Sequence, residues 1–94
     1  MAFVYVQDLE GMQLADYDRV NEALKPDEDP PDGLILHTAS GTDSGVRIVD
    51  VWESREAEER FRDGRLMPAV QQAGLQPGSP NHPDVHEVHH LLKP

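Results

Sequence analysis

The sequence has 94 residues, of which eighteen are Asp or Glu and eight are Lys or Arg, so the formal net charge is −10 at pH 7. This charge excludes the basic surface that nucleic acids and anionic membranes attract, and the absence of cysteine excludes disulfides and thiol catalysis. The length predicts one domain over residues 1–94. Because the amino-terminal stretch has neither a basic region nor a long apolar segment, we expect a soluble, cytoplasmic protein.

The first third of the chain predicts a strand, a helix and a loop. FVYVQ at 3–7 is rich in β-branched and aromatic residues, as strands are. In LADYDRVNEAL at 14–24 the apolar residues recur at helical spacing and form one stripe. The stretch KPDEDPPDG at 25–33 contains three prolines and four acids, and it therefore predicts the end of the helix and a solvated loop.

The middle of the chain predicts a β-hairpin. GLILHTA at 33–39 and VRIVDVWE at 46–53 are β-like runs, and the small residues SGTDSG at 40–45 form a turn between them. Ser54 then suits the N-cap of a second helix, because its side chain can accept a hydrogen bond from a free backbone N–H.

The last third predicts an interrupted helix and a fourth strand. Gly64 and Pro68 predict a kink or a second short helix that runs to Ala73, with Gly74 as its stop. An irregular loop at 75–84 precedes VHEVHHLL at 85–92, which is expected to be the fourth strand.

The resulting order is βαββαβ, the pattern of the ferredoxin-like α+β fold, in which a four-stranded antiparallel sheet carries two helices on one face. Leu34 and Leu36 are expected on one side of the second strand, with Ile35 and Ala39 on the other. A sheet that is apolar on both faces needs cover on both. The helices cover one face, and we expect a second copy of the chain to cover the other, making a homodimer.

The segment VRIVDVWESREAEERF, followed by RLMPAV, resembles the third strand and second helix of dimeric α/β-barrel proteins, and most of all the group of antibiotic biosynthesis monooxygenases. The resemblance implies a homodimer with a pocket between helices and sheet in each subunit. Members of the group include cofactor-independent oxygenases of polycyclic aromatic polyketides, haem-degrading enzymes, cyclases and isomerases. Asp50 and Trp52 match an acid and an aromatic found on this strand in several members, whereas Phe61 stands near the place of a helix histidine. Because phenylalanine cannot ligate iron, the departure at Phe61 counts against haem chemistry.

Three histidines cluster in the fourth predicted strand. His86 and His90 share one face of a strand but lie roughly 13 Å apart, too far to bind one metal ion together. Glu87 and His89 are close enough, but a carboxylate and an imidazole alone fall short of a typical zinc or iron site. We therefore expect no metal, and a structural role is the favoured interpretation of the three histidines.

Asp50 and His37 are the candidate catalytic residues. Asp50 interrupts an apolar strand face, and a buried carboxylate is costly unless it is paired or protonated. It either serves as an acid in the pocket or orients a histidine, or it forms a salt bridge to Arg19, Arg60 or Arg62 or accepts a hydrogen bond from a tyrosine. His37 on its apolar strand is either a base or a satisfied core histidine.

The expected function is acid–base chemistry without a bound cofactor, by a monooxygenase-like or cyclase-like enzyme acting on a small hydrophobic or aromatic ligand. The residues expected to contact this ligand are Trp52, Tyr17, Tyr5, His89 and Phe61. The alternative is a dimeric binding or assembly module without catalysis, and a weaker third possibility is a haem or metal protein.

Overall fold

The computed structural model describes residues 1–25, 27–75 and 83–94. Its helices and strands follow one another in the predicted order. They are β1 (Phe3–Glu10), α1 (Leu14–Leu24), β2 (Leu34–Gly41), β3 (Gly45–Trp52), α2 (Arg55–Phe61), the π-helical segment η1 (Arg62–Leu66), α3 (Met67–Gln72) and β4 (Asp84–Glu87).

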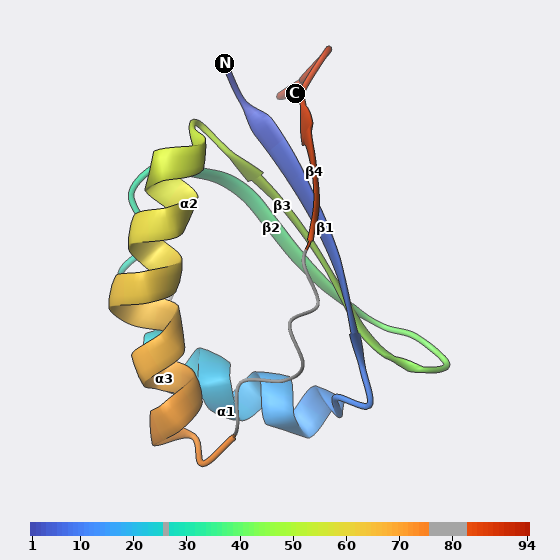
Figure 1. Ribbon diagram of the computed structural model, residues 1–94, viewed down its shortest axis with the longest axis vertical. Helices are drawn as coiled ribbons and strands as arrows, with labels where there is room; N and C mark the ends of the chain where they lie inside the picture. The colour runs from blue at the N-terminus through green and yellow to red at the C-terminus, as the bar shows by residue number, and fades with distance from the viewer. Residues whose placement is uncertain (26, 76–82) are drawn as a thin grey trace.

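The four strands form one antiparallel sheet in the order β2-β3-β1-β4. Figure 1 shows the helices gathered on one side of this sheet, with α2, η1 and α3 stacked into a single column and α1 crossing near the far end. This arrangement is the ferredoxin-like α+β fold, so the fold class expected from the sequence is confirmed.

Both α1 and α2 begin with a hydrogen bond between a side chain and the backbone. The Asp16 carboxylate accepts a hydrogen bond from the Gln13 backbone N–H at 3.2 Å, so α1 starts without one of the usual capping residues. α1 ends at Lys25, which adopts a left-handed conformation with φ of 51°. The Ser54 hydroxyl accepts a hydrogen bond from the Ala57 N–H at 3.1 Å, which confirms Ser54 as the N-cap of α2.

The predicted interruption of the second helix is a widened turn. The Met67 N–H donates to the Arg62 carbonyl five residues back, so η1 is a π-helix. Pro68 follows two residues after Leu66, the last residue of η1. A proline ring has no N–H and, in an ordinary helix, clashes with the carbonyl four residues before it. The chain then continues as the short helix α3 and stops at Gly74, which has φ of 78°.

The hairpin contains an irregularity that the sequence did not predict. Leu34 pairs with Trp52 and Leu36 pairs with Val51, so the register shifts between them and Ile35 is the extra residue of a bulge. The expectation that Leu34 and Leu36 share a face is therefore wrong. Leu34 packs against the core on the helical side, while Leu36 faces outward and is 48 % exposed.

The fourth strand is shorter than expected. β4 covers Asp84–Glu87, not 85–92, and pairs with the start of β1. Beyond it the Val88 N–H donates to the Ala2 carbonyl at 2.9 Å, which continues the pairing by one residue. The chain from His89 to Pro94 is exposed and irregular. Most of the loop expected at 75–84 lies outside the described residues.

The core lies between the sheet and α2, where Tyr5, Trp52 and Ala57 are buried. The opposite face of the sheet is apolar as well: Val51 is buried beneath its neighbours there, and Leu36 is largely exposed. In the described ranges no helix has the length and apolar character needed to cross a membrane.

Candidate functional site

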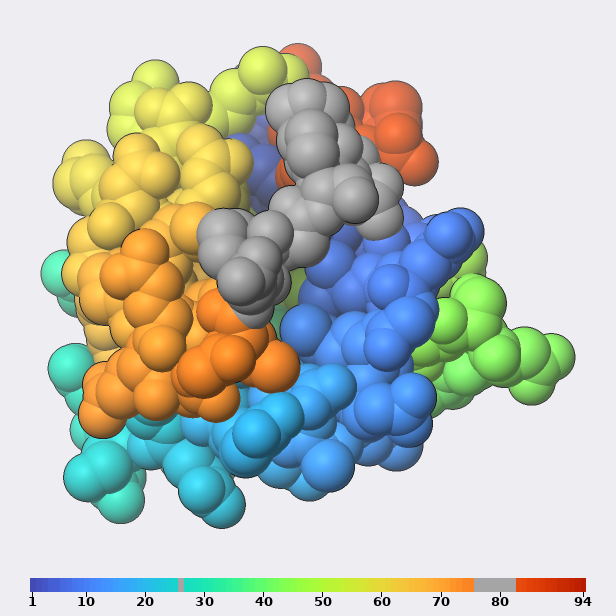
Figure 2. Space-filling view, turned by 60° about the horizontal axis from the view of Figure 1, so that its bottom comes forward, coloured from blue at the N-terminus to red at the C-terminus, as the bar shows by residue number. Residues whose placement is uncertain are grey.

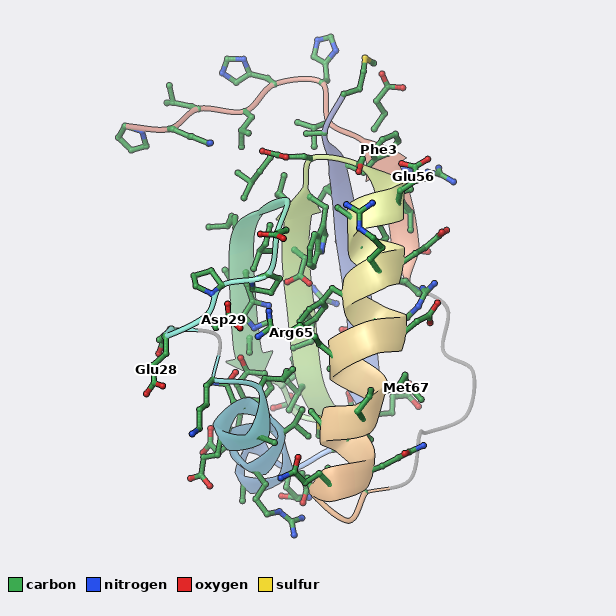
Figure 3. All side chains as sticks on the ribbon, turned by 90° about the vertical axis from the view of Figure 1, so that its left-hand side faces the viewer. Phe3, Glu28, Asp29, Glu56, Arg65 and Met67 are labelled. Carbon is green, nitrogen blue, oxygen red and sulfur yellow. The ribbon has the colours of Figure 1, made fainter. Side chains whose placement is uncertain are left out.

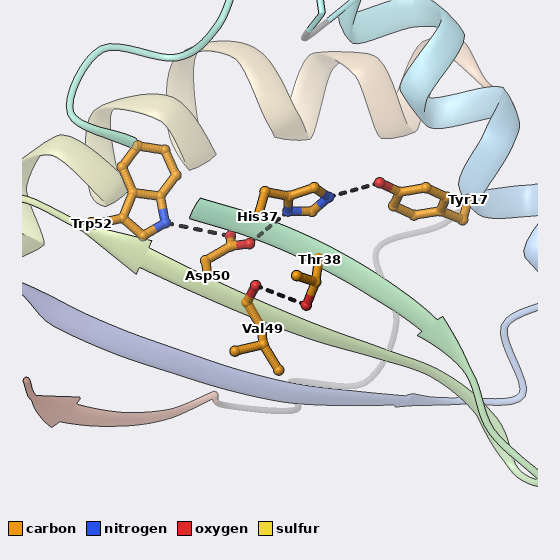
Figure 4. A network of polar contacts seen from close by, with 6 residues as sticks. All are labelled: Tyr17, His37, Thr38, Val49, Asp50 and Trp52. Atoms are coloured by element: carbon orange, nitrogen blue, oxygen red, sulfur yellow. Dashed lines mark hydrogen bonds and ion pairs between the residues drawn. The ribbon is translucent and has the colours of Figure 1, made fainter. Parts of the chain in front are cut away.

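A chain of hydrogen bonds links four of the residues that the sequence singled out (Figure 4). Asp50 on β3 lies directly opposite His37 on β2, and its Oδ1 is 2.5 Å from the His37 Nδ1. On the other side of the imidazole, the His37 Nε2 is 2.7 Å from the Tyr17 hydroxyl, which α1 supplies. The Trp52 indole N–H donates to the remaining Asp50 oxygen at 3.3 Å.

These contacts assign the proton positions of the neutral imidazole. A carboxylate only accepts hydrogen bonds, so Nδ1 carries the proton that it donates to Asp50. Nε2 then has a free lone pair and accepts from the Tyr17 O–H. The hydrogen bond to Asp50, supported by its negative charge, raises the pKa of His37 above its usual value, although burial opposes the change. His37 is therefore held as a base whose protonated form is stabilised.

Tyr17 is a hydrogen-bond donor at this site. Burial raises the pKa of its hydroxyl, and the negative charges of Asp50, Asp18 and Asp27 act in the same direction. Its ring lies within 13° of parallel to the His37 imidazole, with 6.0 Å between the ring centroids. The phenol therefore stays protonated at neutral pH and shields one end of the imidazole.

Trp52 is anchored firmly in the core. It is 1 % exposed, and its ring centroid lies 5.4 Å from that of Phe61 on α2. The Arg65 guanidinium covers the Phe61 ring and donates to the backbone carbonyl of Asp29 at 2.9 Å (Figure 3). This packing fixes the indole N–H that orients Asp50, so Trp52 and Phe61 support the hydrogen-bonded chain from one side.

Asp50 does not use any of the arginines considered from the sequence. Arg19 pairs with Asp16, and Arg62 pairs with Glu58 at 3.2 Å. Both Asp50 oxygens instead contact His37 and Trp52. Of the possibilities left open by the sequence, the contacts fit that of a carboxylate that orients a histidine.

Two further groups, Tyr5 and Glu58, lie on the same side of the sheet. Tyr5 pairs with Asp50 across β1 and β3 and is 8 % exposed. Burial raises the pKa of its hydroxyl, and the negative charge of Glu58 raises it further to a smaller extent. Glu58 was missed by the sequence analysis, although it lies next to Ala57 and one turn before Phe61 on the inward side of α2. Burial raises its carboxyl pKa, and Arg62 opposes that rise.

The open end of the chain is at His37. Its side chain is 33 % exposed, compared with 18 % for Asp50. Figure 2 shows the surface hollowed between α3 and the blue segment formed by β1 and α1. Two depressions lined by described residues lie elsewhere. One is between the loop at 29–32 and the Phe61 region of α2, and the other is between the hairpin tip and the start of α1. Neither is lined by His37, Asp50 or Trp52.

The carboxy-terminal histidines are not brought to this site. His86 on β4 pairs with Val4 of β1, and His89 and His90 lie beyond the strand and are exposed. His82 is outside the described residues. Among the residues that the structure describes, no group of three or more histidines and acids is placed to hold a metal ion.

Comparisons with known proteins bear on the fold. The structure resembles that of Rv0793 from Mycobacterium tuberculosis, with a TM-score of 0.66 and 15 % identity over 98 % of each chain. A protein from Bacillus cereus, provisionally described as an antibiotic biosynthesis monooxygenase, aligns with a TM-score of 0.47 and 18 % identity over 99 % of this chain and 93 % of that one. No family model and no curated protein matches the sequence. At 15 % identity, the likeness to Rv0793 supports the shared fold and no particular activity.

Proposed function

We propose that this protein is a homodimer that binds a small aromatic ligand and acts on it by acid–base chemistry, as a cofactor-independent monooxygenase-like or cyclase-like enzyme. The observation that carries the proposal is the position of His37 between the Asp50 carboxylate and the Tyr17 hydroxyl. A histidine held by a carboxylate through Nδ1 has its other nitrogen available as a base.

The simplest reaction of this kind is oxygenation of a hydroxyanthrone. His37 Nε2 takes a proton from the activated CH₂ group, and the imidazolium that forms is stabilised by Asp50. The resulting carbanion passes electrons to O₂ and forms a carbon–oxygen bond, giving a peroxide. The peroxide takes the proton back from His37 and loses water, so that CH₂ and O₂ become C=O and H₂O. A cyclase would use the same proton removal next to a carbonyl group to form a carbon–carbon bond.

The other members of the chain position the base. Asp50 has both oxygens occupied within the protein, so it acts through His37 and not on the ligand. Trp52 orients Asp50 from the buried core. Tyr17, the half-buried donor, is placed to move its hydrogen bond from Nε2 to the oxygen on which negative charge develops.

The homodimer is proposed from the outer face of the sheet. Val4 pairs with Val51 and Val6 with Val49 on that face, and Leu36 extends it on the edge strand. With 5 % aromatic residues, the core of one chain is small, and a second sheet would bury this apolar surface. Sedimentation should give a dimer for the wild type and a monomer for Leu36→Lys. A wild-type monomer at micromolar concentration would contradict the proposed assembly.

The enzymatic proposal is tested with a hydroxyanthrone as substrate. Oxygen consumption and the absorbance of the quinone product are followed for the wild type and for His37→Gln. We expect the rate to fall by about 100-fold or more in the variant, because general base catalysis typically contributes that much. His90→Gln, which removes an exposed histidine beyond the end of β4, is the matched control and should keep wild-type turnover. Equal rates in wild type and His37→Gln would refute the role of His37.

A non-catalytic dimeric binding module is the second candidate. It is favoured by the tight packing of Trp52 and by the complete satisfaction of Asp50 within the fold. In that case His37→Gln and Asp50→Asn would lower thermal stability or dimerisation, and none of the proteins would turn over substrate above the rate in buffer.

A further inference from the structure

A depression of about 360 Å³ lies between α2 and the loop that precedes β2. Its apolar lining comes from both sides: the loop contributes Pro30 and Pro31, and the helix contributes Ala57 and Phe61. Sites for small molecules in proteins have volumes of about 300–1,000 Å³, so the depression is large enough for a small ligand. None of the four residues of the hydrogen-bonded chain lines it, which makes it separate from the base at His37.

The loop side of the depression offers hydrogen-bond acceptors and negative charge. Asp29 and Asp32 both line it, and both residues are exposed. Between them stand two prolines, which have no backbone N–H to donate. The loop side therefore suits a ligand group that donates hydrogen bonds and carries positive charge.

The helical side offers donors and positive charge from Arg60 and Arg65. Arg65 is engaged within the protein, because it donates to the Leu24 and Asp29 carbonyls and its Nη2 is 3.6 Å from the Asp29 carboxylate (Figure 3). Within residues 1–25, 27–75 and 83–94, no ion pair or hydrogen bond uses the Arg60 guanidinium or the Asp32 carboxylate. One cation on the helix and one anion on the loop thus remain to meet a ligand.

We propose that this depression is a second ligand site, which binds an α-amino acid with an apolar side chain in its zwitterionic form. The ligand carboxylate pairs with the Arg60 guanidinium, whose planar donors match it, and the ligand ammonium pairs with the Asp32 carboxylate. The side chain of the ligand packs on Phe61 and the two prolines. A zwitterion meets both unpaired charges at once, whereas an anion or a cation of the same size leaves one of them unmatched.

Phe61 joins the depression to an internal reporter. Its ring centroid lies 5.4 Å from that of Trp52, the one tryptophan of the sequence. Trp52 is 1 % exposed and does not line the depression, so a ligand there reaches the indole through the Phe61 ring. Occupancy of the site should therefore change the fluorescence of Trp52.

Three compounds that share a phenyl ring test the need for both charges. L-Phenylalanine carries both, 3-phenylpropionate lacks the ammonium group, and 2-phenylethylamine lacks the carboxylate. Isothermal titration calorimetry at neutral pH measures their affinities for the wild-type protein. We expect L-phenylalanine to bind about fivefold more tightly than either of the others, which is the upper end of the effect of one exposed ion pair.

Variants assign each charge preference to its residue. Arg60→Gln should abolish the advantage of L-phenylalanine over 2-phenylethylamine, and Asp32→Asn should abolish its advantage over 3-phenylpropionate. Lys93→Gln and Glu22→Gln, which remove exposed charges of the same signs away from the depression, are the controls and should bind all three compounds as the wild type does. All four changes are at exposed residues, and circular dichroism checks that the variants are folded.

Three calorimetric results would overturn the inference: no binding of L-phenylalanine at millimolar concentration, equal affinity for the three compounds, or a preference that survives in both Arg60→Gln and Asp32→Asn. Binding without any change in Trp52 fluorescence would also overturn it, because the ligand would then lie away from Phe61. None of these results depends on turnover, so the proposed acid–base function stands or falls separately with His37→Gln.

Discussion

Replacement of Asp50 by asparagine is the most informative perturbation of the hydrogen-bonded chain. The two side chains have the same shape, so the packing against Trp52 is kept while the negative charge beside His37 is lost. The contact of 2.5 Å joins His37 Nδ1 to Asp50 Oδ1, and the two side chains are 33 % and 18 % exposed. We therefore expect its strength to lie between that of a buried and that of a surface ion pair. Hydrogen bonds to charged groups contribute about 1.5–3 kcal/mol and exposed pairs about 0.2–1 kcal/mol. We therefore expect Asp50→Asn to lower the free energy of unfolding by about 1–2 kcal/mol in acid.

The loss should depend on pH in a definite direction. Asp50 raises the pKa of His37 in the folded protein above its unfolded value of about 6.5. The stability from this interaction is therefore fully present below about pH 6.5 and is lost as the pH rises through the folded pKa. Asp50→Asn should consequently cost more at about pH 5.5 than at about pH 9, with less than half of the effect remaining at the higher pH.

Chemical denaturation at the two pH values, followed by circular dichroism, measures these differences. Asp8→Asn is the matched control, because Asp8 contacts Arg47 at 2.7 Å and neither group titrates in this range. Its effect should be the same at both pH values. An Asp50→Asn effect that is constant, or larger at high pH, would refute the coupling between Asp50 and protonated His37.

Three substitutions test the scaffold around the site by thermal or chemical unfolding. Gly33→Ala should destabilise by about 2 kcal/mol or more, since Gly33 has φ of 87° and an added Cβ would lie 2.6 Å from the Ala57 Cβ; an unchanged midpoint would contradict the close approach. Ser54→Ala should cost about 1 kcal/mol through loss of the cap, whereas Ser54→Asp should retain most of the stability. Arg65→Met should cost about 1–2 kcal/mol, because it removes hydrogen bonds to the backbone carbonyls of Leu24, the last residue of α1, and of Asp29 in the loop that follows. Equal stability of the wild type and Arg65→Met would show that these bonds contribute nothing.

The fold could be predicted from local patterns in the sequence. The hydrogen bond between His37 and Asp50 depends in addition on the register in which β2 pairs with β3. The helical stripe, the Ser54 cap and the hairpin were readable because each depends on neighbours in the chain. The hairpin turn also held the signal for the site. The Thr42 N–H donates to the Gly45 carbonyl at 2.8 Å, and counting back from this pair along both strands places His37 opposite Asp50. To predict this pairing from the sequence, Thr42 and Gly45 would have had to be recognised as the residues that close the turn.

Other features depended on contacts that the sequence does not encode locally. The bulge at Ile35 is set by packing of Leu34 on the Trp52 core, and a strict alternation of faces could not reveal it. The length of β4 follows its pairing with Phe3–Val6 of β1 and not the apolar run at 85–92. The burial of the Glu58 side chain depends on how α2 packs, which tertiary structure alone determines.

The tautomer of His37 tests the central claim most directly. A long-range ¹H–¹⁵N correlation spectrum, recorded at a pH where the imidazole is neutral, distinguishes a protonated Nδ1 from a protonated Nε2. The chain from Tyr17 through His37 to Asp50 predicts a proton on Nδ1 and a free lone pair on Nε2 in the wild type, with the proton moved to Nε2 in Asp50→Asn. A wild-type spectrum with the proton on Nε2 would contradict the account, because that nitrogen could then not serve as the base.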